Sequence, residues 1–454
     1  MPYLTPLLFS FLLFTSTFLS PASAACHVDD ESGLLSFKSG ITSDPSGLLT
    51  SWKKGTDCCT SWNGVSCDQV NRVNSISIYG DLANSTKYLS GTISPKLRKL
   101  KNLSAFSLVD TRNISGPLPG FLFRIPNIQI IYIQNNKLSG HITKWIGNLT
   151  QLVALGLNGN QFTGNIPVSL SKLTELSQLF LQQNQFSGKI PEIFTSLTKI
   201  SSLNFAYNKF SGNIPQTLAH LAPQVRYLDF SHNLLTGQIP SFFGNFKPLD
   251  TLTLSHNGLS GTVPKTFANL TKIFNLDLSY NQLVDPFPEL KVIGIDTIDL
   301  SYNRFNLVQI PSWITSSPII SSLKLAKCGL KFKLQDWKPK TVYYYDYIDL
   351  SDNLISGSAV KLINSTEYLK SFAASNNQLK FDFGTLKIPK TLKSLDLSKN
   401  LLFGKVPKEI SGLEKLNVSV NHLCGAIPAN KFPAAAFKDN DCLCGSPLPP
   451  CKKV

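Results

Sequence analysis

Leucines and other large apolar residues recur along most of this chain in one frame, Leu-x-x-Leu-x-Leu-x-x-Asn-x-Leu. The Asn slot of this frame recurs every 21 to 25 residues. The thirteen residues that fill the slot are Asn136, Asn160, Asn184, Asn208, Asn233, Asn257, Asn281, Asn303, Cys328, Asn353, Asn377, Asn400 and Asn421. A fixed period of this size predicts a solenoid in which each turn contacts only its neighbours.

Within each turn, the alternation of apolar and polar positions predicts one short strand. In residues 152–160 the leucines point inward, while Ala154, Gly156 and Asn158 point outward. One strand per turn, always running the same way, gives an α/β solenoid with a parallel concave sheet. The buried Asn amide can then pair with backbone groups of adjacent turns. Cys328 fills the same slot in one turn, a substitution that this type of repeat accepts.

A second signature, Leu/Phe-Ser/Thr-Gly-x-Ile-Pro, follows the strand in the regular turns, for example at residues 186–191. Its Gly permits the turn off the strand, and its Pro stiffens the convex return. The signature fails between residues 283 and 386 and then resumes. We therefore predict one domain with two ends that cover an array. The predicted parts are a signal peptide at 1–24, an N-terminal cap at 25–81, repeats at 82–422 (irregular over 283–386) and a C-terminal cap at 423–454.

The first residues of the chain predict the cellular compartment. Residues 7–14 form an apolar core, and Ala22-Ser23-Ala24 is a small-residue cleavage site. Since no other segment approaches the length of a membrane span, we expect secretion without a membrane anchor. The formal charge of +15 suits an anionic membrane or an acidic polysaccharide, and the secretory leader disfavours nucleic acid as a partner.

Eight of the nine cysteines form two groups of four that flank the repeats. They are Cys26, Cys58, Cys59 and Cys67 before the array, and Cys424, Cys442, Cys444 and Cys451 after it. Such groups fit disulfide-bonded covers for the exposed ends of a solenoid core. Four cysteines permit three pairings, and the spacing alone does not choose among them.

Seven Asn-x-Ser/Thr acceptors offer sites for N-glycosylation. They are Asn84, Asn102, Asn113, Asn148, Asn269, Asn364 and Asn417. Asn417 lies between inward residues of a predicted concave strand, where a sugar would remove binding area.

Motifs of nucleophilic, metal-dependent or phosphate-binding catalysis do not occur in the sequence. Five aspartates at the x of Leu-x-Leu align as an acidic stripe, but the repeat itself generates that alignment. They are Asp229, Asp277, Asp299, Asp349 and Asp396. We therefore expect a protein that is not an enzyme, with no catalytic residues, no metal and no cofactor.

A concave strand surface is the default binding site of a solenoid, because many turns face one ligand. The position just before the Asn slot carries Tyr207, His232, His256, Tyr280, Tyr302 and Lys327 in successive turns. Nearby turns add Tyr132, Phe180, Gln182, Arg226, Tyr227 and Lys324. Aromatic side chains give large contact area at low entropic cost, which favours protein binding here. The alternative is a row of solvent-facing strand residues without a ligand.

Lysines concentrate in the irregular stretch and suggest a second binding surface. Six of them fall within 17 residues against one acid, Asp336. The six are Lys324, Lys327, Lys331, Lys333, Lys338 and Lys340. With Trp337 beside them, they suit an anionic sugar polymer or an acidic protein surface. A solvated basic face is the equally plain alternative.

The caps and loops resemble those of a known group of proteins. The motif at 58–67, Cys-Cys-Thr-Ser-Trp-Asn-Gly-Val-Ser-Cys, and the repeated Leu-Ser-Gly-x-Ile-Pro resemble plant extracellular leucine-rich repeat proteins. The ending at 440–448, Asn-Asp-Cys-Leu-Cys-Gly-Ser-Pro-Leu, is similar to polygalacturonase inhibitors and secreted DNA-damage-repair/toleration-type proteins. The resemblance implies a right-handed plant-type coil with the pairs Cys26–Cys58, Cys59–Cys67, Cys424–Cys442 and Cys444–Cys451.

The resemblance also implies functions. A defence protein of the plant cell wall or apoplast would bind a microbial pectinase on its concave face and associate with pectin through its basic charge. This chain has more turns than those inhibitors, and its irregular stretch lies where receptor ectodomains often carry a ligand-binding interruption. A soluble receptor-like component that binds a peptide or a receptor kinase is therefore the rival hypothesis, and a structural wall glycoprotein is a third.

Overall fold

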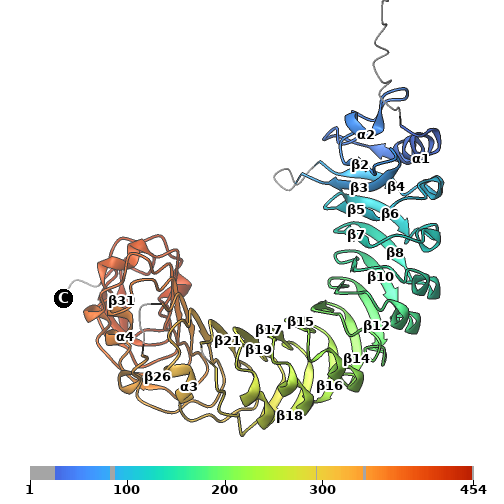
Figure 1. Cartoon of the computed structure of the whole chain (residues 1–454). Helices are drawn as coiled ribbons and strands as arrows, with labels where there is room; N and C mark the ends of the chain where they lie inside the picture. The colour runs from blue at the N-terminus through green and yellow to red at the C-terminus, as the bar shows by residue number, and fades with distance from the viewer. Residues whose placement is uncertain (1–25, 82–86, 293, 341–343, 452–454) are drawn as a thin grey trace, which may run out of the picture.

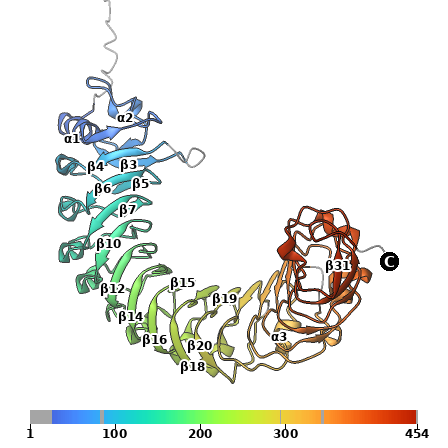
Figure 2. The same cartoon turned by 180° about the vertical axis from the view of Figure 1, so that it is seen from behind.

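The computed structural model describes residues 26–81, 87–292, 294–340 and 344–451. The predicted signal peptide and the acceptor Asn84 lie outside the described residues. The chain winds into a curved coil with its first and last turns at opposite ends of the arc (Figure 1). The view from behind shows the same arc (Figure 2). The predicted solenoid with a parallel concave sheet is confirmed.

A sixteen-stranded sheet lines the inner side of the arc (Figure 1). Its strands, in spatial order, are β2 (Val65–Cys67), β3 (Val73–Tyr79), β5 (Ala105–Val109), β7 (Ile130–Gln134), β9 (Ala154–Gly156), β11 (Gln178–Phe180), β13 (Ser202–Asn204), β15 (Tyr227–Asp229), β17 (Thr251–Thr253), β19 (Asn275–Asp277), β21 (Thr297–Asp299), β22 (Ser322–Lys324), β23 (Tyr347–Asp349), β25 (Ser371–Ala373), β27 (Ser394–Asp396) and β29 (Lys415–Asn417). β2 pairs with β3 antiparallel, and the later strands pair in parallel with equivalent residues opposite one another, such as Leu228 and Leu252. Equivalent positions of successive turns therefore form columns across the sheet.

A second sheet, which the sequence did not predict, runs beside the first along the regular turns. Its ten strands are β1 (Ile41–Ser43), β4 (Leu89–Thr92), β6 (Arg112–Pro117), β8 (Lys137–Gly140), β10 (Gln161–Gly164), β12 (Gln185–Lys189), β14 (Lys209–Gly212), β16 (Leu234–Gln238), β18 (Gly258–Thr262) and β20 (Gln282–Val284). All of these strands except β1 and β20 contain the Ser/Thr-Gly part of the loop signature, in which Gly188 takes a φ of +75°. The expectation of one strand per turn was therefore wrong for these turns, because their loops also pair with one another.

The second sheet stops at Val284, where the loop signature fails. Beyond it, the loop strands form only two smaller sheets among the described residues. They are β24 (Ser356–Gly357) with β26 (Gln378–Leu379), and β28 (Phe403–Gly404) with β30 (His422–Ala426) and β31 (Cys442–Cys444). The sixteen-stranded sheet continues through the same region without a break. In the irregular stretch the second sheet is therefore lost, whereas the concave sheet is intact.

Short helices form the outer side of the turns. Most are 3-10 helices: η1 (Pro95–Lys99), η2 (Leu122–Arg124), η3 (Lys144–Asn148), η4 (Val168–Lys172), η5 (Gln216–Leu221), η6 (Ser241–Asn245), η7 (Lys265–Asn269), η8 (Leu334–Asp336), η9 (Phe383–Thr385), η10 (Lys408–Gly412) and η11 (Ala434–Ala436). The α-helices are α1 (Val28–Ser39) and α2 (Cys58–Ser61) near the N-terminus, and α3 (Ser312–Thr315) and α4 (Val360–Asn364) in the irregular stretch. The signature proline precedes several of them, as Pro240 does for η6. No helix of the described residues is both long enough and apolar enough to cross a membrane.

The Asn column holds neighbouring turns together through side-chain to backbone hydrogen bonds. Asn281 is 8% exposed, and its Nδ2 donates to the carbonyl of Leu254 in the preceding turn at 2.9 Å. Its Oδ1 accepts the backbone N–H of Leu259 at 3.0 Å. The amide thus supplies a partner to the buried N–H of Leu259 and shares the Leu254 carbonyl with Asn257 Nδ2, which donates to it at 3.2 Å. The predicted role of the slot is confirmed.

Cys328 fills the slot with a weaker set of contacts. Its Sγ lies 3.4 Å from the carbonyl oxygen of Leu300 and 3.6 Å from that of Ala326, and the side chain is fully buried. Burial raises the pKa of this thiol, so it stays protonated and can donate its single S–H to either oxygen. The predicted buried thiol is confirmed.

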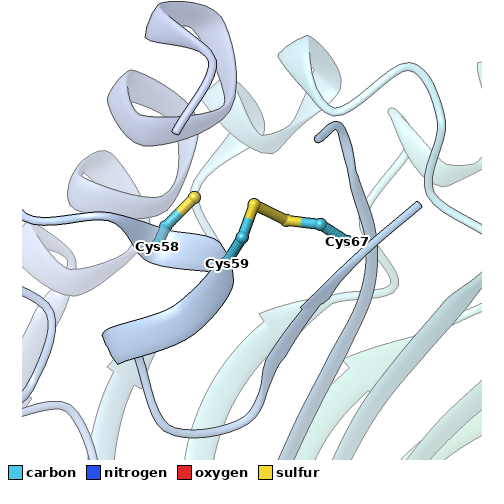
Figure 3. A group of neighbouring side chains, drawn as sticks. All are labelled: Cys58, Cys59 and Cys67. Carbon is cyan, nitrogen blue, oxygen red and sulfur yellow. A yellow bond between two sulfur atoms is a disulfide. The ribbon is translucent and has the colours of Figure 1, made fainter. Parts of the chain in front are cut away.

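Four disulfides close the two ends of the array, in the pairing that the family resemblance implied. They join Cys26 to Cys58, Cys59 to Cys67, Cys424 to Cys442, and Cys444 to Cys451. The sulfur atoms of Cys58, Cys59 and Cys67 lie within 4.8 Å of one another (Figure 3). Cysteine binds a metal as a thiolate, and all three of these sulfurs are in disulfides. The cluster therefore cross-links the N-terminal cap and offers no thiolate ligand.

A buried ion pair also fastens the N-terminal cap to the first strands. Asp30 of α1 is 0% exposed and accepts two hydrogen bonds from the Arg72 guanidinium, at 2.9 Å from Nε and 2.8 Å from Nη2. The same carboxylate accepts the backbone N–H of Val73 at 2.9 Å. In the same cap, Phe37 of α1 packs against Trp52, whose ring stacks on that of Trp62 at 5.4 Å between their centroids. Helix and sheet are thus joined by polar as well as apolar contacts.

Candidate functional site on the concave face

The residue before each Asn slot lies just past the end of its concave strand and has a left-handed backbone. The φ angles run from 51° to 55° for Tyr207, His232, His256, Tyr280, Tyr302 and Lys327. These residues were expected on the strands, and that expectation was wrong. The chain must turn sharply there to send the following Asn into the core, and only a positive φ does so. The same turn in every repeat brings these side chains into one column.

The aromatic residues of this column form a continuous stack, which we call the ring ladder (Tyr207, His232, His256, Tyr280 and Tyr302). Successive ring centroids are 3.9, 4.0, 4.1 and 4.5 Å apart, and the ring planes differ by only 11° to 18°. Neighbouring strands of a sheet are about 4.8 Å apart, so the sheet itself holds the rings at stacking distance. Within the ladder the ring faces cover one another, and Tyr207 and Tyr280 remain exposed while the other three residues are half-buried.

Hydrogen bonds extend the ring ladder past Lys327 to two residues that were not predicted from the sequence. The Tyr302 hydroxyl donates to Oδ2 of Asp352 at 3.1 Å, and Asp352 Oδ1 accepts from Asn376 Nδ2 at 2.7 Å. Burial, together with the hydrogen bond to Asp352, raises the pKa of Tyr302 to about 12. Tyr302 is therefore a neutral donor at any physiological pH. Asp352 and Asn376 each precede an Asn of the slot, so following the same position along the sequence would have found them.

The two imidazoles at the centre of the ring ladder interact electrostatically. Burial lowers the pKa of His232, and a positive charge on His256 lowers it further, while Asp229 and Asp277 oppose the shift. We expect the His232 imidazole to titrate below the ordinary histidine value of about 6.5 in an NMR pH titration. His256→Ala should raise that midpoint, because it removes both the covering ring and the neighbouring charge. A midpoint unchanged by the substitution would contradict stacking of these rings in solution.

The acidic stripe proves to be part of the scaffold. In each of its strands the aspartate Oδ1 accepts the backbone N–H of the serine two residues on, at 2.9 Å in Asp229 and 3.0 Å in Asp277. Burial raises the pKa of Asp229 and of Asp299, and Asp277 adds to the shift of Asp299. Lys324 Nζ lies 3.7 Å from Asp299 and also stands over the Tyr347 ring. The stripe therefore shapes the strand ends and contributes negative charge beside the ring ladder.

A shallow hollow of about 390 Å³ lies on the same face, nearer the N-terminus. Its walls are Phe180, Gln182, Ser202, Asn204 and Tyr227. Burial raises the pKa of Tyr227 to about 12, and its hydroxyl accepts from Asn204 Nδ2 at 3.2 Å. Three predicted residues, Phe180, Gln182 and Tyr227, are therefore brought together here.

Two other predicted residues stand apart from the hollow. The Tyr132 hydroxyl donates to Gln178 Oε1 at 2.7 Å. Arg226 is exposed and lies 3.4 Å from Asp250. Both face solvent on or beside concave strands, outside the walls of the hollow.

The lysine cluster of the irregular stretch is divided by the coil. Lys324 lies on the concave strand β22 and Lys327 in the turn after it. Lys338 and Lys340 line a hollow of about 470 Å³ with Trp337 and residues of α3, on the outer side. Lys324 and Lys327 therefore lie apart from Lys338 and Lys340, although all four were predicted to share one surface.

The predicted glycosylation acceptors differ in how their side chains are held. Asn102 donates to Asp68, Asn113 donates to Ser90, and the Asn417 side chain accepts from Ser419. The backbone N–H of Lys387 donates to Asn364 Oδ1. Asn148 and Asn269 lie exposed at equivalent positions, the last residues of η3 and η7.

Comparison with known families agrees with the fold. The family described as Leucine rich repeat N-terminal domain matches residues 27–68, and those described as Leucine rich repeat match residues 223–283, 127–149, 151–173, 175–197, 199–221 and 391–413. The protein is thus a leucine-rich repeat protein with an N-terminal leucine-rich repeat cap. These matches describe repeats and a cap, and none of them indicates an enzyme.

Curated relatives from plants match part of the chain. Polygalacturonase inhibitor 2 of Arabidopsis thaliana is 40% identical over 111 residues, which are 23% of this chain and 34% of that protein. DNA damage-repair/toleration protein DRT100 of Arabidopsis thaliana is 31% identical over 121 residues, 25% of this chain and 32% of that protein. The matched segments thus span about a third of the length of these relatives.

Solved structures of plant ectodomains match the chain over a greater length. The LRR ectodomain of the receptor kinase GASSHO1/SCHENGEN3 from Arabidopsis thaliana superposes with a TM-score of 0.67 at 27% identity, over 87% of this chain and 50% of that one. A TDR receptor superposes with a TM-score of 0.61 at 25% identity, over 83% of this chain and 69% of that one. The protein has the fold of plant leucine-rich repeat ectodomains, which supports a protein-binding role.

Proposed function

We propose that this protein is a secreted recognition protein of the plant cell wall or apoplast, which binds another protein on its concave face through the ring ladder. The observation that carries the proposal is the unbroken stack from Tyr207 to Tyr302, continued by the hydrogen bonds to Asp352 and Asn376. Such a column spans several turns, as a protein ligand would require. The disulfide caps and the likeness to the ectodomain of a plant membrane receptor kinase support the compartment.

The ring ladder is suited to binding because it is already ordered. Stacked rings lose little side-chain entropy when a partner arrives, and preorganisation of this kind increases affinity without new contacts. Tyr207 is 51% exposed and Tyr280 is 43% exposed, so the edges are accessible. Tyrosine edges present hydroxyl groups and partly positive C–H groups, which favour backbone carbonyls and carboxylates of a partner. The accessible edges therefore define a row of polar contacts on an apolar body.

Inhibition of a microbial pectinase is the first candidate, because polygalacturonase inhibitors are among the relatives. The net charge of +15 would also allow association with anionic pectin. Binding of a peptide or receptor kinase, as a soluble receptor-like component, is the second candidate. Here the supporting observation is the likeness to the GASSHO1/SCHENGEN3 ectodomain, which was solved in complex with CASPARIAN STRIP INTEGRITY FACTOR 2.

A pull-down from the apoplastic fluid of infected plants separates the two candidates. Recovery of a fungal polygalacturonase, together with slower pectin hydrolysis, supports inhibition. Recovery of a plant receptor kinase or a peptide supports signalling. If the protein leaves pectin hydrolysis unchanged for each of several pectinases, inhibition is excluded.

Truncation of the ring ladder should weaken binding of the recovered partner. We expect the double variant Tyr280→Ala, Tyr302→Ala to raise Kd at least tenfold, about 1.4 kcal/mol, since buried aromatic residues at interface centres commonly contribute about 2 kcal/mol or more each. The measurement is surface plasmon resonance or calorimetry with the purified partner. Tyr368→Ala, at a residue 57% exposed and outside the ring ladder, is the matched control. Equal affinities for the double variant and the control would place the binding site elsewhere.

A further inference from the structure

An apolar hollow of about 480 Å³ lies on the outer side of the first turns. Its walls include Leu118, Phe121 and Trp145, and the Trp145 side chain is 56% exposed. The volume falls in the range of small-ligand pockets, about 300–1,000 Å³. Lys144 Nζ stands over the Trp145 ring at 5.3 Å from its centroid, yet the residue stays more than half exposed, so apolar surface that a ligand could cover remains in water here.

The acceptor asparagine Asn148 is itself part of the wall of this hollow. Trp145 and Asn148 are three residues apart in the 3-10 helix η3. Residues three apart eclipse one another in a 3-10 helix, so both side chains lie on the same face. The Asn148 side chain is exposed and is followed by Leu149 and Thr150, which completes the acceptor motif. A sugar attached to Asn148 would therefore begin its course next to the indole ring.

The polar groups around the rim suit a sugar. The guanidinium groups of Arg98 and Arg124 are exposed at the hollow and offer donors for hydroxyl and acetamido oxygens. The apolar face of a pyranose packs on an aromatic ring as other C–H surfaces do, and the tether keeps the local sugar concentration high. Both contacts are available to a sugar that starts at Asn148.

The chain contains its own comparison for this site. Asn269 ends η7 as Asn148 ends η3, and it carries the acceptor motif Asn269-Leu270-Thr271. Three residues before it stands Thr266 in place of an aromatic residue. Asn269 thus offers the same attachment geometry without the indole.

We propose that the hollow beside Trp145 binds an N-linked glycan attached to Asn148. This glycan packs on the indole and covers the apolar walls. The proposal rests on the extracellular location proposed above. The glycan lies on the outer side, so it leaves the ring ladder free for a partner. Trp145 acts here as a sugar-binding residue within the same molecule.

Tryptophan fluorescence gives a direct test, because Trp145 is far more exposed than the other tryptophans that line the core. Trp52, Trp62 and Trp313 are 1%, 3% and 6% exposed, and Trp337 is half-buried. The protein is produced as a secreted glycoprotein in plant cells, and occupancy of Asn148 and Asn269 is mapped by peptide mass spectrometry. Acrylamide quenching is then compared for wild type, Asn148→Gln, Thr150→Ala and Asn269→Gln, each with and without Trp145→Phe.

We expect occupied Asn148 in the wild type and a rise in quenching in both Asn148→Gln and Thr150→Ala. The rise should disappear in the Trp145→Phe background, and Asn269→Gln should leave quenching unchanged. An unoccupied Asn148 contradicts glycan binding in the hollow. If Asn269 is occupied in the same preparation, the chain has been secreted and the extracellular location stands. Quenching that is unaltered by loss of the Asn148 glycan also overturns glycan binding in the hollow. Failure of the chain to enter the secretory pathway overturns both proposals.

Discussion

Asn281→Ala should lower the free energy of unfolding by about 1–3 kcal/mol, since it removes the Asn281 partner of two buried backbone groups and only one of them keeps another side-chain donor, Asn257 Nδ2 at 3.2 Å. The groups are the carbonyl of Leu254 and the N–H of Leu259, which bond the Asn281 amide at 2.9 and 3.0 Å. Both belong to the preceding turn, so the loss falls on an interface between turns. Urea unfolding at equilibrium measures the loss, and hydrogen exchange should show it concentrated on the strands around β17 and β19.

Cys328→Ala provides the matched control within the same column. Its sulfur makes only two long contacts, at 3.4 and 3.6 Å, and S–H is a weak donor. We therefore expect a clearly smaller loss than for Asn281→Ala. Equal losses would show that the slot acts through packing volume and that its hydrogen bonds contribute little.

Arg72→Leu should destabilise the N-terminal cap by about 3–5 kcal/mol, because it leaves a buried carboxylate without its partner. The Asp30 side chain is 1% exposed and that of Arg72 is 20% exposed, so solvent cannot replace the guanidinium. The hydrogen bond to Asp30 raises the pKa of Arg72, which keeps the guanidinium charged. Thermal and urea unfolding of the full chain measure the effect.

Arg226→Leu tests the same kind of pair at the surface. Arg226 and Asp250 lie 3.4 Å apart with side chains 70% and 38% exposed. Exposed pairs contribute about 0–1 kcal/mol, so we expect almost no change in stability. A loss for Arg226→Leu as large as that for Arg72→Leu would mean that burial does not decide the strength of these pairs.

The concave sheet, the Asn column and the disulfide-bonded ends could be predicted because a periodic chain repeats the same local instruction many times. The second sheet was missed because its strands contain Gly at a positive φ, as at Gly188, which reads as a turn in any single repeat. Only the stacking of turns lets these loop backbones pair. The pair of Asp30 and Arg72 was missed because 42 residues separate its members and no period links them.

The candidate site was predicted in composition and missed in arrangement. The column of Tyr207, His232 and their successors was visible in the sequence, but its positive φ and face-to-face stacking depend on the turn after each strand. Asp352 joins the column through a hydrogen bond that skips one turn, a contact that no local pattern reveals. The repeat shows which residues belong to the column, whereas their contacts depend on how the turns align in three dimensions.

The backbone register also limits how the ring ladder can evolve. The distance between its rings is fixed by backbone hydrogen bonds between neighbouring turns, such as that from the His232 N–H to the Ser255 carbonyl at 2.9 Å. A point substitution can exchange one rung for another side chain, yet it cannot alter the pitch. New binding specificities can therefore arise by substitution of single residues of the ladder, while the spacing between their side chains stays constant. Duplication or loss of a whole turn would lengthen or shorten the ring ladder without changing the spacing between neighbouring rings.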